Sequence, residues 1–266
     1  MPDFSLFDLC ISNKIGNKII KFFNKHSNLQ KSPLPKLTKS EKDYLNQINS
    51  SAIDFKEKTI ATHSGVNFKL YYQPIFHAIQ VFVKRLEVSN NFVLRGEPNF
   101  SHKNRSERSF REPYECNWWL EIEKTLPPLN NLLSIILYSD ATTLDGLGKF
   151  SGHPVFLTLS NLPNQIRNSP ESKVFLGFLP KVQDSGIKTT DSFRSFQRET
   201  FHKCFNIMLQ PLLVKPDSLH FGIKGRVKIF AARISFFLAD MLEADEITAT
   251  FKSANCKMPC YTCMVL

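Results

Sequence analysis

Three apolar segments of strand length, separated by turn-rich links, constrain the fold of this 266-residue chain most strongly. They are residues 132–139, 153–160 and 173–180. The links between them contain Gly, Asn, Pro and Ser, which are the residue types that favour turns. Strands that follow one another through short links pair most simply as an antiparallel meander. The sequence therefore predicts a sheet in the second half of the chain.

A helix and a fourth strand are expected after the meander. Residues 191–213 place apolar side chains along one helical face, with Asp191 as the expected N-cap and an end near Pro211. Residues 227–240 form a further apolar segment that finishes on Asp240, as the first strand finishes on Asp140. Two strands would thus each carry a carboxylate at their polar end.

The first half of the chain is more polar and is expected to be mostly helical. Residues 9–26 fit a short basic amphipathic helix, and residues 68–86 show helical spacing after Pro74. Residues 95–119 are polar and basic, which predicts a long surface connection that ends at a pair of tryptophans acting as a packing anchor. We expect a basic, partly ordered lead-in at 1–64, a helical pre-core region with a basic loop at 65–130, and a core at 131–266.

The charge balance favours a polyanionic partner. Thirty-four Lys and Arg residues against 24 Asp and Glu residues give a formal charge of +10 and a pI near 9.3. Nucleic acid and an anionic membrane surface both fit this charge, as does an ordinary solvated basic surface. No apolar stretch approaches the roughly 20 residues of a membrane span, and no secretory signal is recognisable. We therefore expect no membrane association, and a reducing compartment in which clustered cysteines indicate metal before disulfide.

The two strand-terminal aspartates suit a hard divalent cation. If their strands are neighbours in one sheet, both carboxylates can bind magnesium or manganese, which prefer oxygen ligands. A pair of such ions supports phosphodiester chemistry by activating a water or hydroxyl and stabilising the leaving oxygen. Strand-terminal aspartates are also common turn and helix-cap residues, and that alternative stays open for Asp140 and Asp240.

Longer stretches of the sequence resemble one family. Residues 137–180, 201–213, 234–245 and 257–266 resemble in order and spacing the catalytic core of the Plavaka-type transposases, a fungal group of cut-and-paste DNA transposases. Upstream, residues 68–83 and 114–127 look like the segments that precede the core in that group. The resemblance covers most of the chain from about residue 65.

The resemblance implies an α/β, ribonuclease H-like mixed sheet with a DDE active site, incomplete at its C-terminus. Asp140 matches the first metal-binding aspartate and Asp240 the second, with Mg²⁺ or Mn²⁺ as the implied cofactor. The family's usual proline after the second aspartate is absent here, although Glu243 is kept. The third acid is expected on a helix beyond residue 266, so Asp145 and Glu243 are the local candidates. We therefore expect weak or absent catalysis.

The cysteines near the end of the sequence suggest part of a zinc site. Cys260 and Cys263 have the C-x-x-C spacing that holds one zinc ion, and Cys256 is close enough to join them. A closed site needs four ligands, and free thiols are the alternative. His202 and Cys204 lie on an apolar helix face and are expected to be core or boundary residues.

Basic side chains near the expected carboxylate site are candidate DNA contacts, because Arg and Lys bind phosphate. They are Lys149, Arg167, Lys173, Arg194 and Arg198. The implied partner is DNA at transposon ends, and nuclear localisation follows only from that partner. Two alternatives remain: a non-enzymatic DNA-binding or host-adopted protein that keeps the fold, and a non-functional open-reading-frame remnant whose apolar sheet surface lies bare.

Overall fold

The computed structural model describes residues 13–26, 55–101, 107–143, 151–182 and 190–249. The chain forms two compact units, residues 1–53 with 143–151 and residues 54–142 with 152–266. In the first unit, α1 (Asn13–His26) is the expected basic amphipathic helix, and Lys25 and His26 lie in its last turn. Cations there interact favourably with the carbonyl end of the helix.

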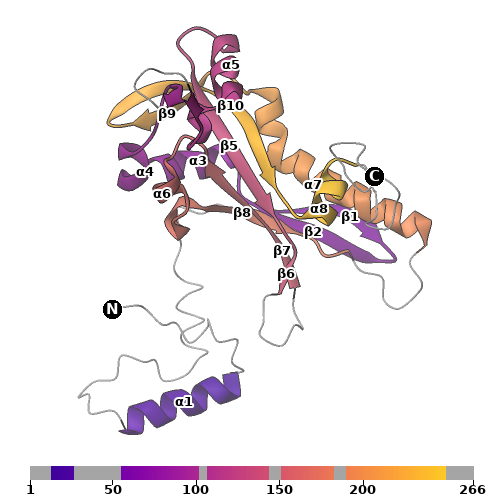
Figure 1. The fold of residues 1–266 in the computed structure, drawn as a ribbon. Coiled ribbons are helices and arrows are strands. Elements are labelled where there is room, and N and C mark those ends of the chain that lie inside the picture. The colour runs from indigo at the N-terminus through magenta and orange to yellow at the C-terminus, as the bar shows by residue number, and fades with distance from the viewer. Residues whose placement is uncertain (1–12, 27–54, 102–106, 144–150, 183–189, 250–266) are drawn as a thin grey trace. The chain divides into compact units, whose positions relative to one another are not determined.

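The second unit contains a curled mixed sheet with the strand order β1-β2-β8-β7-β5-β10-β9 (Figure 1). The strands are β1 (Lys56–His63), β2 (Val66–Tyr72), β5 (Asn131–Ser139), β7 (Ser151–Leu159), β8 (Val174–Leu179), β9 (Leu219–Ile223) and β10 (Arg226–Leu238). A separate two-stranded sheet pairs β3 (Asn99–Phe100) with β4 (Arg108–Ser109), and β6 is Thr142–Thr143.

Helices connect these strands. They are α3 (Ile75–Val83), α4 (Leu86–Asn90), α5 (Asn117–Thr125), α6 (Asn164–Arg167), α7 (Asp191–Val214), α8 (Met241–Ile247) and the 3₁₀ turns η2 (Pro113–Glu115) and η3 (Pro170–Ser172). No helix of the described residues is long and apolar enough to cross a bilayer.

The predicted meander is confirmed. β5 pairs antiparallel with β7, and β7 pairs antiparallel with β8. The fourth predicted strand, β10, lies on the other side of β5 and runs parallel to it. The α/β class is therefore correct, and the two strands that end in aspartates are neighbours in one sheet.

The expectation of a mostly helical region before the core is wrong for residues 56–72, which form the β1–β2 hairpin. Ser64 and Gly65 form its turn with φ of 48° and 78°, the left-handed conformation that two-residue hairpin turns need. β2 then joins the main sheet through β8, where a Cβ on Gly177 would collide with the Tyr71 carbonyl oxygen. The predicted helix after Pro74 is present as α3.

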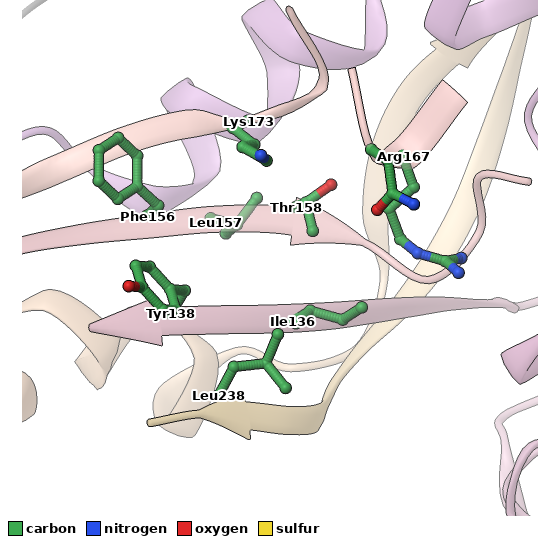
Figure 2. Close-up of a pocket in the computed structure, with 9 residues that line it drawn as sticks. Ile136, Tyr138, Phe156, Leu157, Thr158, Arg167, Lys173 and Leu238 are labelled. Carbon is green, nitrogen blue, oxygen red and sulfur yellow. The ribbon is translucent and has the colours of Figure 1, made fainter. Parts of the chain in front are cut away.

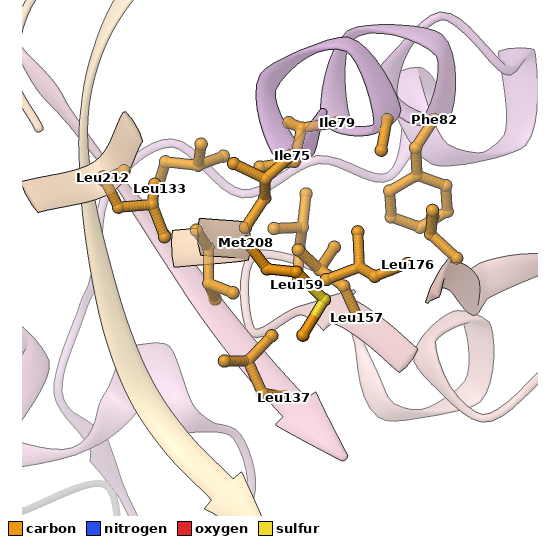
Figure 3. Close-up of a cluster of buried hydrophobic side chains, with 14 of the residues drawn as sticks. Ile75, Ile79, Phe82, Leu133, Leu137, Leu157, Leu159, Leu176, Met208 and Leu212 are labelled. Carbon is orange, nitrogen blue, oxygen red and sulfur yellow. The ribbon is translucent and has the colours of Figure 1, made fainter. Parts of the chain in front are cut away.

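The main core lies between one face of the sheet and helices α3 and α7 (Figure 3). Alternate residues of β5, among them Leu133, Ile135 and Leu137, point into it and are fully buried. Met208 and Leu212 of α7 meet them from the helix side. This packing fixes β5 in the middle of the domain and with it the position of Asp140.

Helix α7 differs from the prediction at both ends. Thr190, not Asp191, is the N-cap, because its side chain accepts a hydrogen bond from the backbone N–H of Phe193. Pro211 lies inside the helix, which continues to Val214. Proline removes one backbone donor but does not stop a helix whose other residues remain packed. Met208 and Leu212 on either side of Pro211 are buried, which holds this last part in place.

On the opposite face of the sheet, side chains near the start of β5 are also buried. Trp119 of α5 is fully buried there and meets Tyr114 edge to face, whereas Trp118 is exposed. Asn161 is also fully buried; it accepts a hydrogen bond from Ser134 N–H and donates to the carbonyls of Val93 and Leu132. The tryptophan pair is thus a packing anchor through Trp119 alone.

Candidate metal-binding site

The ends of β5 and β10 bring the two predicted aspartates to the same edge of the sheet. In the parallel register Leu238 lies opposite Tyr138, and each strand reaches its aspartate two residues later. Asp140 is half-buried, and its Oδ2 accepts a hydrogen bond of 3.2 Å from the Tyr138 hydroxyl. The neighbouring-strand arrangement is as expected, while the metal-binding role of both residues stays a prediction.

Asp240 also has a structural role. It is the N-cap of α8, and its Oδ1 accepts a hydrogen bond of 2.8 Å from the backbone N–H of Glu243. The helix-cap alternative therefore applies to this residue, and an aspartate cap contributes about 1 kcal/mol relative to alanine. The capping contact uses Oδ1, and Asp240 as a residue is exposed.

Glu243 is the buried acid of the site. It is 7% exposed, and its Oε1 accepts hydrogen bonds from Ser139 Oγ at 2.9 Å and from His153 Nε2 at 2.7 Å. An ionised carboxylate can only accept, so Nε2 carries the proton in this contact. Oε2 has no hydrogen bond to any residue that the structure describes. Glu243 is thus held at the junction of β5, β7 and α8.

Several acids act on one another at this junction. Burial, then the hydrogen bond to Asp140 and the negative charges of Asp140, Asp240 and Glu243, raise the pKa of Tyr138. The Tyr138 hydroxyl is therefore in a negatively charged environment.

One turn further along α8, partial desolvation of the carboxyl and the charge of Glu243 raise the pKa of Glu246, although the residue as a whole is exposed, while His153, Arg198 and His202 act in the opposite direction. The site thus combines clustered negative charge with cationic groups on α7.

The chemistry of these side chains fits a hard divalent cation in part. Carboxylate oxygens are the donors that Mg²⁺ and Mn²⁺ prefer, and Asp140 and Asp240 supply two of them. Within the described ranges, however, no group of three His, Cys, Asp or Glu side chains is arranged to hold a metal ion. The arrangement fits a weak, partly hydrated site that needs another ligand.

Asp145, the other local candidate for a third acid, lies outside the described residues, as do Lys149 and the cysteines 256, 260 and 263. Their proposed roles stay predictions.

Cys204 is fully buried in the core, and burial raises the pKa of its thiol to about 12. His202 is partly buried on the same helix, so both residues are the core and boundary residues that were expected.

The remaining basic candidates differ in how accessible they are. Arg167 is mostly buried and donates to Glu112 Oε2 at 3.2 Å and to the Leu162 carbonyl, so its guanidinium already has partners. Arg194 pairs with Asp191 on the surface of α7, and Arg198 is half-buried on the same helix. Lys173 is exposed, and its ammonium makes no hydrogen bond or ion pair with the residues described.

Sequence reasoning did not identify Ser139 or His153 as site residues. In the sequence, Ser139 is the last residue of one predicted strand and His153 is the first residue of another. No motif links either residue to Glu243. The one available signal was their position, because each stands at the end of a strand next to the expected carboxylates.

At this edge of a mixed sheet, Asp140 and Asp240 follow two neighbouring strands, and the buried Glu243 lies in the helix that begins after Asp240. The family model described as Plavaka transposase matches residues 39–265. The chain belongs to the Plavaka transposase family. Comparisons with curated proteins and with solved structures found no match.

Proposed function

We propose that this chain forms the catalytic-core part of a transposon-derived, cut-and-paste DNA transposase with a ribonuclease H-like sheet. The observation that carries the proposal is the parallel register of β5 and β10, which brings Asp140 and Asp240 to one sheet edge in a member of this family. The antiparallel meander followed by a parallel fourth strand supports the same fold. DNA as substrate agrees with the charge of +10, and nuclear localisation belongs to the proposal through that substrate.

In this proposal Asp140 and Asp240 hold Mg²⁺ or Mn²⁺. When bound, such an ion activates a water or a 3′-hydroxyl and stabilises the leaving oxygen during phosphodiester cleavage. Tyr138 orients the Asp140 carboxylate through its hydroxyl. Glu243 orients Asp240 through its backbone N–H and holds the end of β5 through Ser139. The protein's part is to keep both carboxylates at the site before DNA arrives.

We expect weak metal binding and slow cutting from the described site. Two aspartates leave most of the coordination shell to water, and a tighter site would need more protein ligands. Glu243 Oε2 is the local oxygen that could add one. The rival is a DNA-binding protein without catalysis, which would bind DNA with strong salt dependence and without any need for magnesium.

The test measures cutting of a labelled DNA duplex with Mn²⁺, Mg²⁺ or EDTA, and Mn²⁺ binding by electron paramagnetic resonance. Asp140→Asn keeps an oxygen for Tyr138, and Asp240→Asn keeps a helix cap. Both variants should lose metal binding and any cutting. Asp191→Asn on the exposed first turn of α7 removes the same charge and should change neither.

Metal binding that survives in both aspartate variants would contradict the proposal. Salt-sensitive DNA binding with no cutting, unchanged by metal and by both substitutions, would favour the non-enzymatic rival.

A further inference from the structure

A row of aromatic rings crosses the sheet on the face opposite α3 and α7. Tyr138, Phe156 and Phe175 lie in direct cross-strand register on β5, β7 and β8, so their side chains share this face. Their ring centroids are 6.4 Å and 5.5 Å apart, and Phe55 continues the row at 5.5 Å from Phe175. Tyr138 is 42% exposed and Phe55 40%. Rings on neighbouring strands thus form a partly open apolar platform.

One end of this row lines a hollow of about 570 Å³ (Figure 2). Tyr138, Phe156, Ile136 and Leu238 contribute its apolar wall, and Leu238 is 51% exposed. Lys173 and Arg167 contribute its cationic side. Figure 2 shows Tyr138 and Phe156 at one end and Arg167 at the other. A hollow of this size falls in the range of ligand-binding pockets.

We propose that this face binds unstacked bases of a single DNA strand, with a base in the hollow against Tyr138 and Phe156 and a phosphate at Lys173. Aromatic rings on a sheet bind successive bases by stacking, and a nearby cation neutralises the backbone. The exposed ammonium of Lys173 makes no ion pair with the described residues, so it is free to bind a phosphate. A purely apolar protein segment would cover the rings but leave that charge uncompensated.

The platform is continuous with the candidate metal site. The Tyr138 ring lines the hollow, while its hydroxyl donates to Asp140. A base in the hollow would therefore contact the same tyrosine that binds Asp140. This inference rests on the proposed function for the identity of the ligand, DNA, but not on metal binding or cutting.

Bases can reach these rings only when they are unpaired. The site should therefore prefer single strands and frayed or mismatched ends over an intact duplex, because opening a base pair costs free energy that stacking on the protein must offset.

The test measures binding of fluorescein-labelled dT12 and of a blunt 12-base-pair duplex by fluorescence anisotropy, in EDTA. Tyr138→Thr and Phe156→Val each replace a ring with a β-branched side chain, which suits a strand. Each should weaken dT12 binding about tenfold. Tyr138→Phe keeps the ring and should bind nearly as the original protein does. Lys173→Gln should make the slope of log affinity against log salt concentration shallower by about one, as expected for the loss of one phosphate contact.

Phe110→Val serves as the control, because Phe110 is 58% exposed and lies outside the hollow. Equal losses at Phe110 and at the two rings, or affinity for the duplex equal to that for dT12, would overturn the inference. So would a dimer in sedimentation experiments that Tyr138→Thr dissociates while dT12 binding is unchanged, since the occupant would then be a second copy.

The two proposals can fail separately. Ring-dependent dT12 binding without metal binding at Asp140 and Asp240 would keep this inference and reject the proposed catalytic site. Metal-dependent cutting with ring-independent dT12 binding would keep the proposed catalytic site and reject this inference.

Discussion

Ser139 and Glu243, which lie 104 positions apart in the sequence, are joined by a hydrogen bond of 2.9 Å. Ser139 directly precedes Asp140, and the backbone N–H of Glu243 binds the Asp240 carboxylate. Glu243 therefore links the segments that carry the two candidate metal ligands. Its contact with His153 ties this link to β7, so three separate elements fix the geometry of one small site.

Removing the Glu243 carboxylate should destabilise the fold. Glu243→Ala leaves Ser139 Oγ and His153 Nε2 without their partner in a buried place, which should lower the free energy of unfolding by about 2–4 kcal/mol. Glu243→Gln keeps an accepting oxygen and should cost about half as much. Urea denaturation measures both. Glu199→Ala on the exposed face of α7 is the control and should cost under about 0.5 kcal/mol; a loss as large as that of Glu243→Ala would contradict this account.

Asn161 should be among the most sensitive polar residues of the domain. Asn161→Ala removes three hydrogen bonds that connect β5 to the segment at Val93, and leaves buried backbone groups unpaired. We expect a loss of about 2–4 kcal/mol in urea denaturation. Asn168→Ala removes an exposed side chain that donates a hydrogen bond to Asn164, and it should change stability by no more than about 0.5 kcal/mol. Similar values for both variants would mean that the buried network contributes little.

Glu246 should make stability depend on pH. Its pKa is raised above the ordinary 4.5, so between 4.5 and that higher value the folded protein binds more protons than the unfolded chain. Stability must then fall as pH rises through this window. Glu246→Gln cannot ionise, so it should be more stable than the original protein at pH 7, with the advantage gone below pH 4.5.

Thermal unfolding at pH 4 and pH 7 measures this difference. Glu199→Gln controls for the loss of one negative charge from a basic protein, and an equal gain from Glu199→Gln would reject a specific effect of Glu246.

Cys204 should be almost inert in the folded protein. The thiolate is the reactive form, and a pKa near 12 makes thiolate on the order of a thousandfold scarcer at neutral pH than the ordinary value of 9.0 does. Iodoacetamide labelling mapped by mass spectrometry should modify the half-buried Cys116 before Cys204. Cys204 should react only in denaturant, and rapid labelling in the native protein would show that α7 opens or packs differently.

The sequence predicts the central strands well because their signal is local. Apolar runs at 132–139, 153–160 and 173–180 are bounded by turns, and each became a strand at nearly those residues. The β1–β2 hairpin was missed because β1 is polar and mostly exposed, and because the apolar residues of β2 run on into the apolar segment that forms α3. Its turn, Ser64-Gly65, was the available signal, and Lys224-Gly225 repeats it between β9 and β10 with φ of 50° and 73°.

The candidate site was only partly predictable. Asp140 and Asp240 stand out because each ends an apolar run, but no local feature of either run predicts that their strands pair in parallel. The contact among Ser139, His153 and Glu243 joins three elements through single side-chain atoms, and no local pattern encodes such a meeting. The cap at Thr190 instead of Asp191 shows the same limit, since adjacent polar residues are equally good caps in sequence.

The parallel pairing of β5 with β10 also sets when the site can form. Ser235 of β10 bonds the carbonyl of Ile135, 100 residues earlier in the chain, and contacts across such separations form slowly during folding. At synthesis rates of about 5–20 residues per second, Asp240 is made roughly 5–20 seconds after Asp140. A nascent chain therefore carries the first aspartate alone, and the pair of carboxylates assembles only once β10 has been made and has docked.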